Sequence, residues 1–181
     1  MLMRLKPQDI VIALKFAVIG DTAWTYSSMS VELVMSASEV NSGVKRLLRS
    51  GLLREPIGQE VQPQVNRQAL AEFLGHGLRY AFPIISSGMV RGTPTSYAAE
   101  PLCRDLKNSE EPIPVWPWEH GQSRGFALEP LYRTVPEAAA KDDAFYRALV
   151  VADGLRDPSP RVRAVAEGYL RNLLGVHDEP K

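Results

Sequence analysis

Hydrophobic residues recur every three to four positions in several stretches of the 181-residue chain, a spacing typical of helices with one buried face. The first such stretch predicts a helix over residues 7–19, which Pro7 can begin and Gly20 can end. A shorter stretch predicts a second helix over residues 26–34, with Thr25 as its N-cap.

A third helix is the most sharply bounded element of the sequence. Ser36 and Glu39 have the spacing of a capping box, so this helix should begin at Ala37. Gly51 can end the helix in a left-handed conformation, and Leu52 can supply the apolar contact that accompanies such an ending. Because only residues 35–37 connect the second helix to the third, the two must cross at a steep angle, as in a helix-turn-helix.

The next elements are shorter. Two short strands should flank the turn at residues 56–59, and Asn66 can cap a fourth helix over residues 67–76. Prolines and glycines then interrupt the periodicity, which predicts irregular chain with short strands over residues 114–118 and 125–128.

Two helices should close the chain. Thr134 and Glu137 form a second capping-box pattern ahead of a helix over residues 136–155, which Asp142 can interrupt. The Pro158–Pro160 region separates it from a last helix that runs to Leu174. The predicted fold is α+β and mainly α, with an N-terminal domain over residues 1–80 and a C-terminal dimerisation or partner-binding region over residues 81–181.

Composition indicates a folded, soluble protein. Hydrophobic residues make up 45% of the chain and charged residues 23%, both typical of globular proteins. The sequence contains neither an apolar run of membrane-spanning length nor the apolar core of a signal peptide. The single cysteine, Cys103, is expected to be a buried small side chain in a reducing compartment. We therefore expect a cytoplasmic protein.

The charge is unevenly distributed, although the chain as a whole is neutral. Residues 1–80 contain 9 Lys and Arg against 7 Asp and Glu (net +2), and residues 81–181 contain 12 against 14 (net −2). Residues 35–54 contain four cations against Glu39 alone, a net charge of +3. The excess of positive charge therefore falls on the predicted third helix.

The outward face of this third helix carries small polar side chains at its start and cations along its length. Serine and asparagine can hydrogen-bond to base edges, while lysine and arginine can contact phosphates. The predicted base-contacting residues are Ser38, Asn41 and Ser42, and the capping residue Ser36 is also predicted to be DNA-binding. The predicted phosphate contacts are Lys45, Arg46, Arg49 and Arg54.

The segments "WTYSSMSVEL" and "MSASEVNSGVKRLLRSGLL", together with the ribbon that follows them, resemble bacterial winged helix-turn-helix regulators of the MarR-like kind. This resemblance implies a sequence-specific DNA-binding repressor that acts as a homodimer on double-stranded DNA. Two features depart from the family pattern: Val34 stands where many such turns have glycine, and the wing tip "EPIGQE" has no lysine or arginine. The arrangement is also similar to that of DNA-binding antitoxins, which implies a toxin protein as a partner.

Two alternatives to a DNA-binding regulator remain open. One is a protein-interaction module in which the winged helix only presents a surface and its cations are merely solvated. The other is a regulator that responds to a small molecule bound in a C-terminal pocket. The residues predicted to bind a partner or ligand in these cases are Trp116, Trp118, Phe126 and Tyr132.

Catalysis is not expected from this sequence. The histidines His76, His120 and His177 are scattered, and no second histidine or cysteine lies at ligand spacing from Glu119-His120. The stretch "SSGMVRGT" lacks the lysine and the spacing of a phosphate-binding loop, and no G-x-S-x-G nucleophile motif occurs. We expect neither a metal nor a cofactor.

Overall fold

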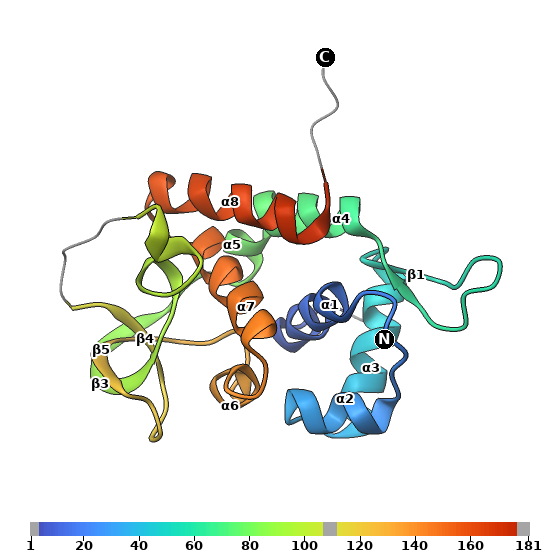
Figure 1. Ribbon diagram of the computed structural model, residues 1–181, viewed down its shortest axis with the longest axis horizontal. Helices are drawn as coiled ribbons and strands as arrows, with labels where there is room; N and C mark the ends of the chain where they lie inside the picture. The colour runs from blue at the N-terminus through green and yellow to red at the C-terminus, as the bar shows by residue number, and fades with distance from the viewer. Residues whose placement is uncertain (1–3, 107–111, 177–181) are drawn as a thin grey trace, which may run out of the picture.

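The computed structural model describes residues 4–106 and 112–176, which form a mainly helical α+β structure (Figure 1). Its elements in chain order are α1 (Pro7–Ile19), α2 (Tyr26–Leu33), α3 (Ala37–Arg49), β1 (Leu53–Arg54), β2 (Gln64–Val65), α4 (Arg67–Glu72), η1 (Phe73–Gly77), α5 (Leu78–Ala81), β3 (Ser86–Pro94), η2 (Ser96–Ala98), η3 (Leu102–Arg104), β4 (Pro114–Pro117), β5 (Ser123–Leu128), α6 (Val135–Ala139), α7 (Asp143–Arg156) and α8 (Pro160–Leu174). In Figure 1, α2, α3 and the β1–β2 hairpin lie at one end of the molecule and the β3–β5 sheet at the other.

The bounds of α1 and α3 confirm the predictions, and α2 ends one residue early. Val34 follows α2 in a left-handed conformation with φ 55°, which is strained for a β-branched side chain. Ser36 and Glu39 form the predicted capping box at the start of α3. Gly51, with φ 77°, ends the helix: its N–H bonds to Leu48 O, and the Leu52 N–H bonds to Leu47 O.

The helix that follows the β1–β2 hairpin is longer than predicted. It begins at the Asn66 cap and continues through the π-helical segment η1 to the end of α5 at Ala81. Its buried side chains Leu70, Leu74 and Leu78 are spaced four residues apart. At 3.6 residues per turn such a series drifts around the helix, and a wider π turn keeps all three leucines on one face.

The sheet consists of β3 paired in the antiparallel sense with both β4 and β5, which also pair with each other in parallel and so close a small barrel. β4 and β5 confirm the strands predicted near residues 114–118 and 125–128. β3 was not predicted. A Cβ atom at Gly92 would lie 2.0 Å from Trp116 O, so the close approach of β3 and β4 requires glycine there.

The closing helices are divided as the sequence indicates. Asp142 interrupts the first one, because its carboxylate accepts the Phe145 N–H and caps α7. The predicted capping box at Thr134 is wrong. Thr134 has no cap hydrogen bond, and its hydroxyl instead donates to Leu33 O at the end of α2.

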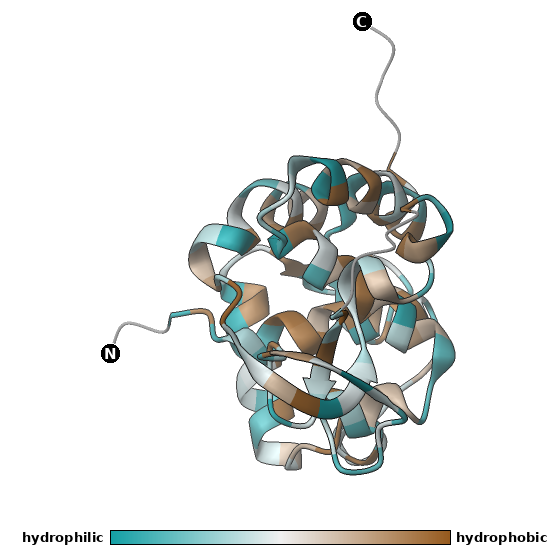
Figure 2. Cartoon of the chain, turned by 90° about the vertical axis from the view of Figure 1, so that its left-hand side faces the viewer, coloured by the Kyte–Doolittle hydropathy of each residue, from teal (hydrophilic) through white to brown (hydrophobic). Residues whose placement is uncertain are grey.

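The hydrophobic core is continuous across residue 80. One cluster of buried side chains joins α1, α2, α3 and α4 with α7 and α8, so the C-terminal helices fold back on the N-terminal ones. Figure 2, viewed from the sheet side, shows hydrophobic segments of the helices turned toward the middle of the molecule. No helix among the described residues is long and apolar enough to cross a membrane.

Two charge networks, each centred on a buried side chain, join distant elements. Lys15 on α1 binds Glu32 on α2 at 2.6 Å and Asp142 at 2.7 Å. Burial opposes the charged form of Lys15, but these hydrogen bonds hold its pKa above the ordinary value.

The second network is centred on Asp153 of α7, which is 1% exposed. Its carboxylate accepts bonds from Thr95, Trp116 and Arg156, which attaches the sheet to α7.

Candidate nucleic-acid interface

The inner face of α3 packs against the hydrophobic core. This packing determines which side chains of α3 point to solvent. Val40, Val44 and Leu47 are buried at helical spacing against α1 and α2. At 3.6 residues per turn, the opposite side of the helix carries Ser38, Asn41, Ser42, Lys45 and Arg49. The predicted outward face therefore exists as one continuous stripe, which we call the α3 stripe.

The α3 stripe is open to solvent. Ser38, Ser42, Lys45 and Arg49 are exposed, and Asn41 is half-buried. None of the five side chains has a hydrogen-bond or ion-pair partner among residues 4–106 and 112–176. Their donors, acceptors and charges are therefore available to another molecule.

Arg46 does not belong to this stripe, and its prediction as a free phosphate contact is wrong. Its guanidinium forms a two-pronged ion pair with Asp9 of α1, Nε to Oδ2 at 2.7 Å and Nη2 to Oδ1 at 2.6 Å. The Asp9 carboxylate is fully buried and the Arg46 side chain is only 10% exposed. The pKa of Arg46 is raised by this hydrogen bonding to Asp9. Arg46 fastens α3 to α1.

Arg54 is also paired, at the base of the β1–β2 hairpin. Its guanidinium donates to both carboxylate oxygens of Glu60, at 2.5 and 2.7 Å. The Arg54 hydrogen bond lowers the pKa of Glu60 to about 2, so this carboxylate stays charged and offsets the arginine. The sequence alone does not identify Glu60, six residues away across a turn, as the partner that neutralises Arg54.

The predicted site residues Ser36 and Tyr132 both hydrogen-bond to Glu39 at the start of α3. The Ser36 hydroxyl is used in the capping box with Glu39, and the Tyr132 hydroxyl donates to Glu39 Oε1 at 2.6 Å. These hydrogen bonds hold the pKa of Glu39 below its ordinary value, with Tyr132 as the largest cause. Glu39 lies on the flank of α3 away from the middle of the stripe. The C-terminal segment therefore braces α3 without covering its free side chains.

The aromatic residues predicted to form one ligand pocket are separated by the fold. Trp116 is 1% exposed and its indole N–H donates to Asp153, so it has no surface to offer a ligand. Tyr132 contacts α3, as described above. Phe126 lies on β5, Trp118 directly follows β4, and both are half-buried. The expectation of a common pocket for these four side chains is wrong.

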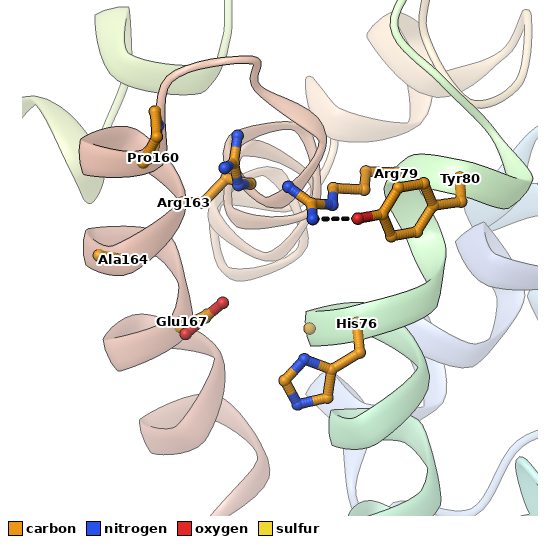
Figure 3. Close-up of a pocket in the computed structure, with 8 residues that line it drawn as sticks. His76, Arg79, Tyr80, Pro160, Arg163, Ala164 and Glu167 are labelled. Atoms are coloured by element: carbon orange, nitrogen blue, oxygen red, sulfur yellow. Dashed lines mark hydrogen bonds between the residues drawn. The ribbon is translucent and has the colours of Figure 1, made fainter.

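A cavity of about 420 Å³ opens elsewhere, between the η1–α5 segment and α8 (Figure 3). The side chains of His76, Arg79, Arg163 and Glu167 line it, so its wall carries both signs of charge. Arg163 already donates to the carbonyl oxygens of Asp157 and Pro158. The cavity is polar and lined by side chains of both charges. No hydrogen bond or ion pair joins an acidic and a basic side chain among the described residues of this lining, so it does not resemble a catalytic acid–base pair.

Cys103 was expected to be buried, but its side chain is only half-buried. His120 is exposed and lies 3.4 Å from the Glu119 carboxylate. His177 lies outside the described residues. Within the described part of the chain, no group of three His, Cys, Asp or Glu side chains could hold a metal ion.

No protein-family model, curated protein sequence or solved structure matches this chain.

Proposed function

We propose that the chain is a winged helix-turn-helix transcriptional regulator that binds double-stranded DNA as a homodimer, with α3 as its recognition helix and the β1–β2 hairpin as its wing. The observation that carries the proposal is the α3 stripe, a row of unpartnered serine, asparagine and cationic side chains on a helix rigidly fixed from behind. A helix presented in this way fits a major groove about 12 Å wide. Such a protein can serve as the DNA-binding antitoxin of a toxin–antitoxin pair, in which case a toxin is the further partner.

Within this proposal, the residues divide into two roles. Ser38, Asn41 and Ser42 contact base edges near the start of α3, and Lys45 and Arg49 contact phosphates further along. Because Arg46 and Arg54 are already paired, two of the four predicted phosphate contacts, Lys45 and Arg49, remain free in each protomer. Two contacts give weak binding by one copy, and a dimer doubles them, which is why the proposal includes a homodimer.

Salt dependence tests the proposal quantitatively. Each phosphate neutralised on duplex DNA contributes about −0.9 to the slope of log affinity against log salt, so two per protomer predict about −1.8, and a dimer about −3.6. In an electrophoretic mobility shift across salt, Lys45→Ala/Arg49→Ala should weaken binding to every duplex and remove most of this slope. The matched control is Arg104→Ala/Arg147→Ala, which removes two arginines that are ion-paired elsewhere. Equal binding by both double variants would rule out the α3 stripe.

A second candidate function, a protein-interaction module, is favoured by the tip of the β1–β2 hairpin. Ile57 is 68% exposed and Val61 is 90% exposed, and the tip carries no cation. Exposed apolar side chains are typical of protein contacts and are poor ligands for phosphates. Under this alternative, Ile57→Lys/Val61→Lys should abolish self-association in analytical ultracentrifugation, and the unmodified chain should not retard any duplex.

A further inference from the structure

The outer face of the β3–β5 sheet carries a pair of arginines directly opposite one another. The strand register pairs Arg91 of β3 with Arg124 of β5. Side chains of directly opposed residues in an antiparallel pair lie on the same face, with Cβ atoms about 4.5–5.5 Å apart. The other face of these strands, with Gly92, Val115 and Ala127, is buried inside the small barrel. The two arginines therefore project outward, and both are exposed.

Nothing in the described part of the chain compensates this arginine pair. Neither guanidinium has a hydrogen bond or a carboxylate within ion-pair distance among residues 4–106 and 112–176. Like charges placed directly opposite each other on neighbouring strands are destabilising. Arg46, Arg54, Arg104, Arg147 and Arg156 do have a carboxylate partner. A negatively charged ligand would relieve the repulsion between the two opposed arginines.

Aromatic and apolar side chains border the arginine pair on the same face. The Trp118 N–H donates to Arg91 O at 3.2 Å, which extends the β3–β4 register and places Trp118 opposite Arg91 on the side away from Arg124. Met89 and Phe126 form the next pair on this face of β3 and β5. Met89 is 48% exposed, and a hollow of about 340 Å³ lies beside Met89 and the two arginines. The sheet lies at the front of Figure 2, away from α3.

We propose that this outer sheet face binds single-stranded nucleic acid, with the arginine pair on the phosphates and Trp118 stacked on a base. Cations beside an aromatic ring are the combination that such ligands require, since stacking needs a base free of its complementary strand. The Trp118 ring is half-buried and has an edge contact with His120, so its remaining open part would receive the base. A duplex keeps its bases stacked inside and would use the arginines alone. The site is distinct from the α3 stripe and does not rest on the function proposed for it.

Fluorescence anisotropy of a labelled oligo(dT) of about 12 nucleotides, within the usual ~4–16 nucleotide site size, tests the proposal on the full chain. Arg91→Ala/Arg124→Ala should weaken binding at least about tenfold and reduce the salt slope by about 1.4, or ~0.7 for each phosphate contact. Trp118→Ala should weaken binding about 5- to 150-fold. Arg91→Lys/Arg124→Lys keeps both charges and should retain the salt slope, while thermal melting checks that each variant is folded.

Two comparisons keep this test separate from the DNA-binding proposal. Lys45→Ala/Arg49→Ala should leave oligo(dT) affinity unchanged, as should the ion-paired control Arg104→Ala/Arg147→Ala. Oligo(dT) binding without any duplex binding would support the sheet site and contradict the function proposed for α3. The sheet proposal is overturned if the unmodified chain does not bind oligo(dT), if the arginine-pair variant binds like the control, or if the α3 variant loses oligo(dT) affinity.

Discussion

The ion pair between Arg46 and Asp9 should matter for folding and not for phosphate contact, and Arg46→Ala tests this. The substitution leaves the Asp9 carboxylate fully buried with the Lys6 N–H, at 2.8 Å, as its remaining hydrogen-bond donor. Removing one partner of a buried ion pair costs about 3–5 kcal/mol. For a chain of this size, each kcal/mol lowers the melting temperature by about 2–4 °C, so we expect a decrease of roughly 6–20 °C.

Differential scanning calorimetry or circular dichroism melting measures this decrease, and two variants serve as controls. Lys45→Ala, one residue away on the exposed stripe, should change the free energy of unfolding by no more than about 0.5 kcal/mol. Asp9→Asn/Arg46→Leu removes both charges and should recover at least about half of the lost stability, because no buried charge is left unpaired. The reasoning is refuted if Arg46→Ala melts like Lys45→Ala and instead loses duplex affinity.

Three further predictions concern the rest of the structure. Asp153→Asn leaves the buried Arg156 cation unpaired and should lower the free energy of unfolding by about 3–5 kcal/mol in chemical denaturation. Gly92→Ala places a Cβ atom 2.0 Å from Trp116 O, so it should separate β3 from β4 and cause early loss of near-ultraviolet circular dichroism on heating. The folded-state pKa of Glu39 is lowered, so its contribution to stability is present above its unfolded pKa near 4.5 and is lost as the pH falls through the lower folded value. The melting temperature should therefore fall more steeply below pH 4.5 in the unmodified chain than in Glu39→Gln; parallel curves would contradict this.

The local signals in the sequence predicted the N-terminal elements well. The capping box at Ser36 and the glycine at residue 51 fixed α3 at both ends, because hydrogen bonds within a few residues determine those boundaries. Val34, which departs from the glycine of the family pattern, adopts the left-handed conformation that glycine would adopt without strain. At Thr134 the same type of pattern failed, because a contact with α2, about a hundred residues earlier, uses its hydroxyl.

The candidate site was predicted only in part, for a related reason. Helical spacing places side chains on one face, and it correctly grouped Ser38, Asn41, Ser42, Lys45 and Arg49. It does not reveal which cations are neutralised by distant carboxylates. Arg46 is paired with a carboxylate 37 positions earlier in the chain, and the packing of α1 against α3 alone brings the two together.

The C-terminal half was harder to predict because its strands are short and rich in glycine and proline. β3 has a mostly exposed first half and lacks the alternation of a half-buried strand, so the sequence gives little sign of it. Trp116 and Trp118 stand two positions apart and therefore lie on the same face of the strand, so the sequence alone does not distinguish them. In the structure α7 covers this face at Trp116, whose indole N–H donates to Asp153, whereas Trp118 lies opposite Arg91 and is half-buried.

The central claim is that side chains in the first two turns of α3 contact base edges of duplex DNA. The most direct measurement is selection of bound duplexes from a random pool by the unmodified chain and by Asn41→Ala, followed by sequencing. We expect the unmodified chain to enrich a two-fold symmetric site, and Asn41→Ala to lose preference at one or two base pairs in each half, a change of about 1–3 kcal/mol at each. An identical enriched sequence for both proteins, or no enrichment by either, would contradict the assignment of α3 as a recognition helix.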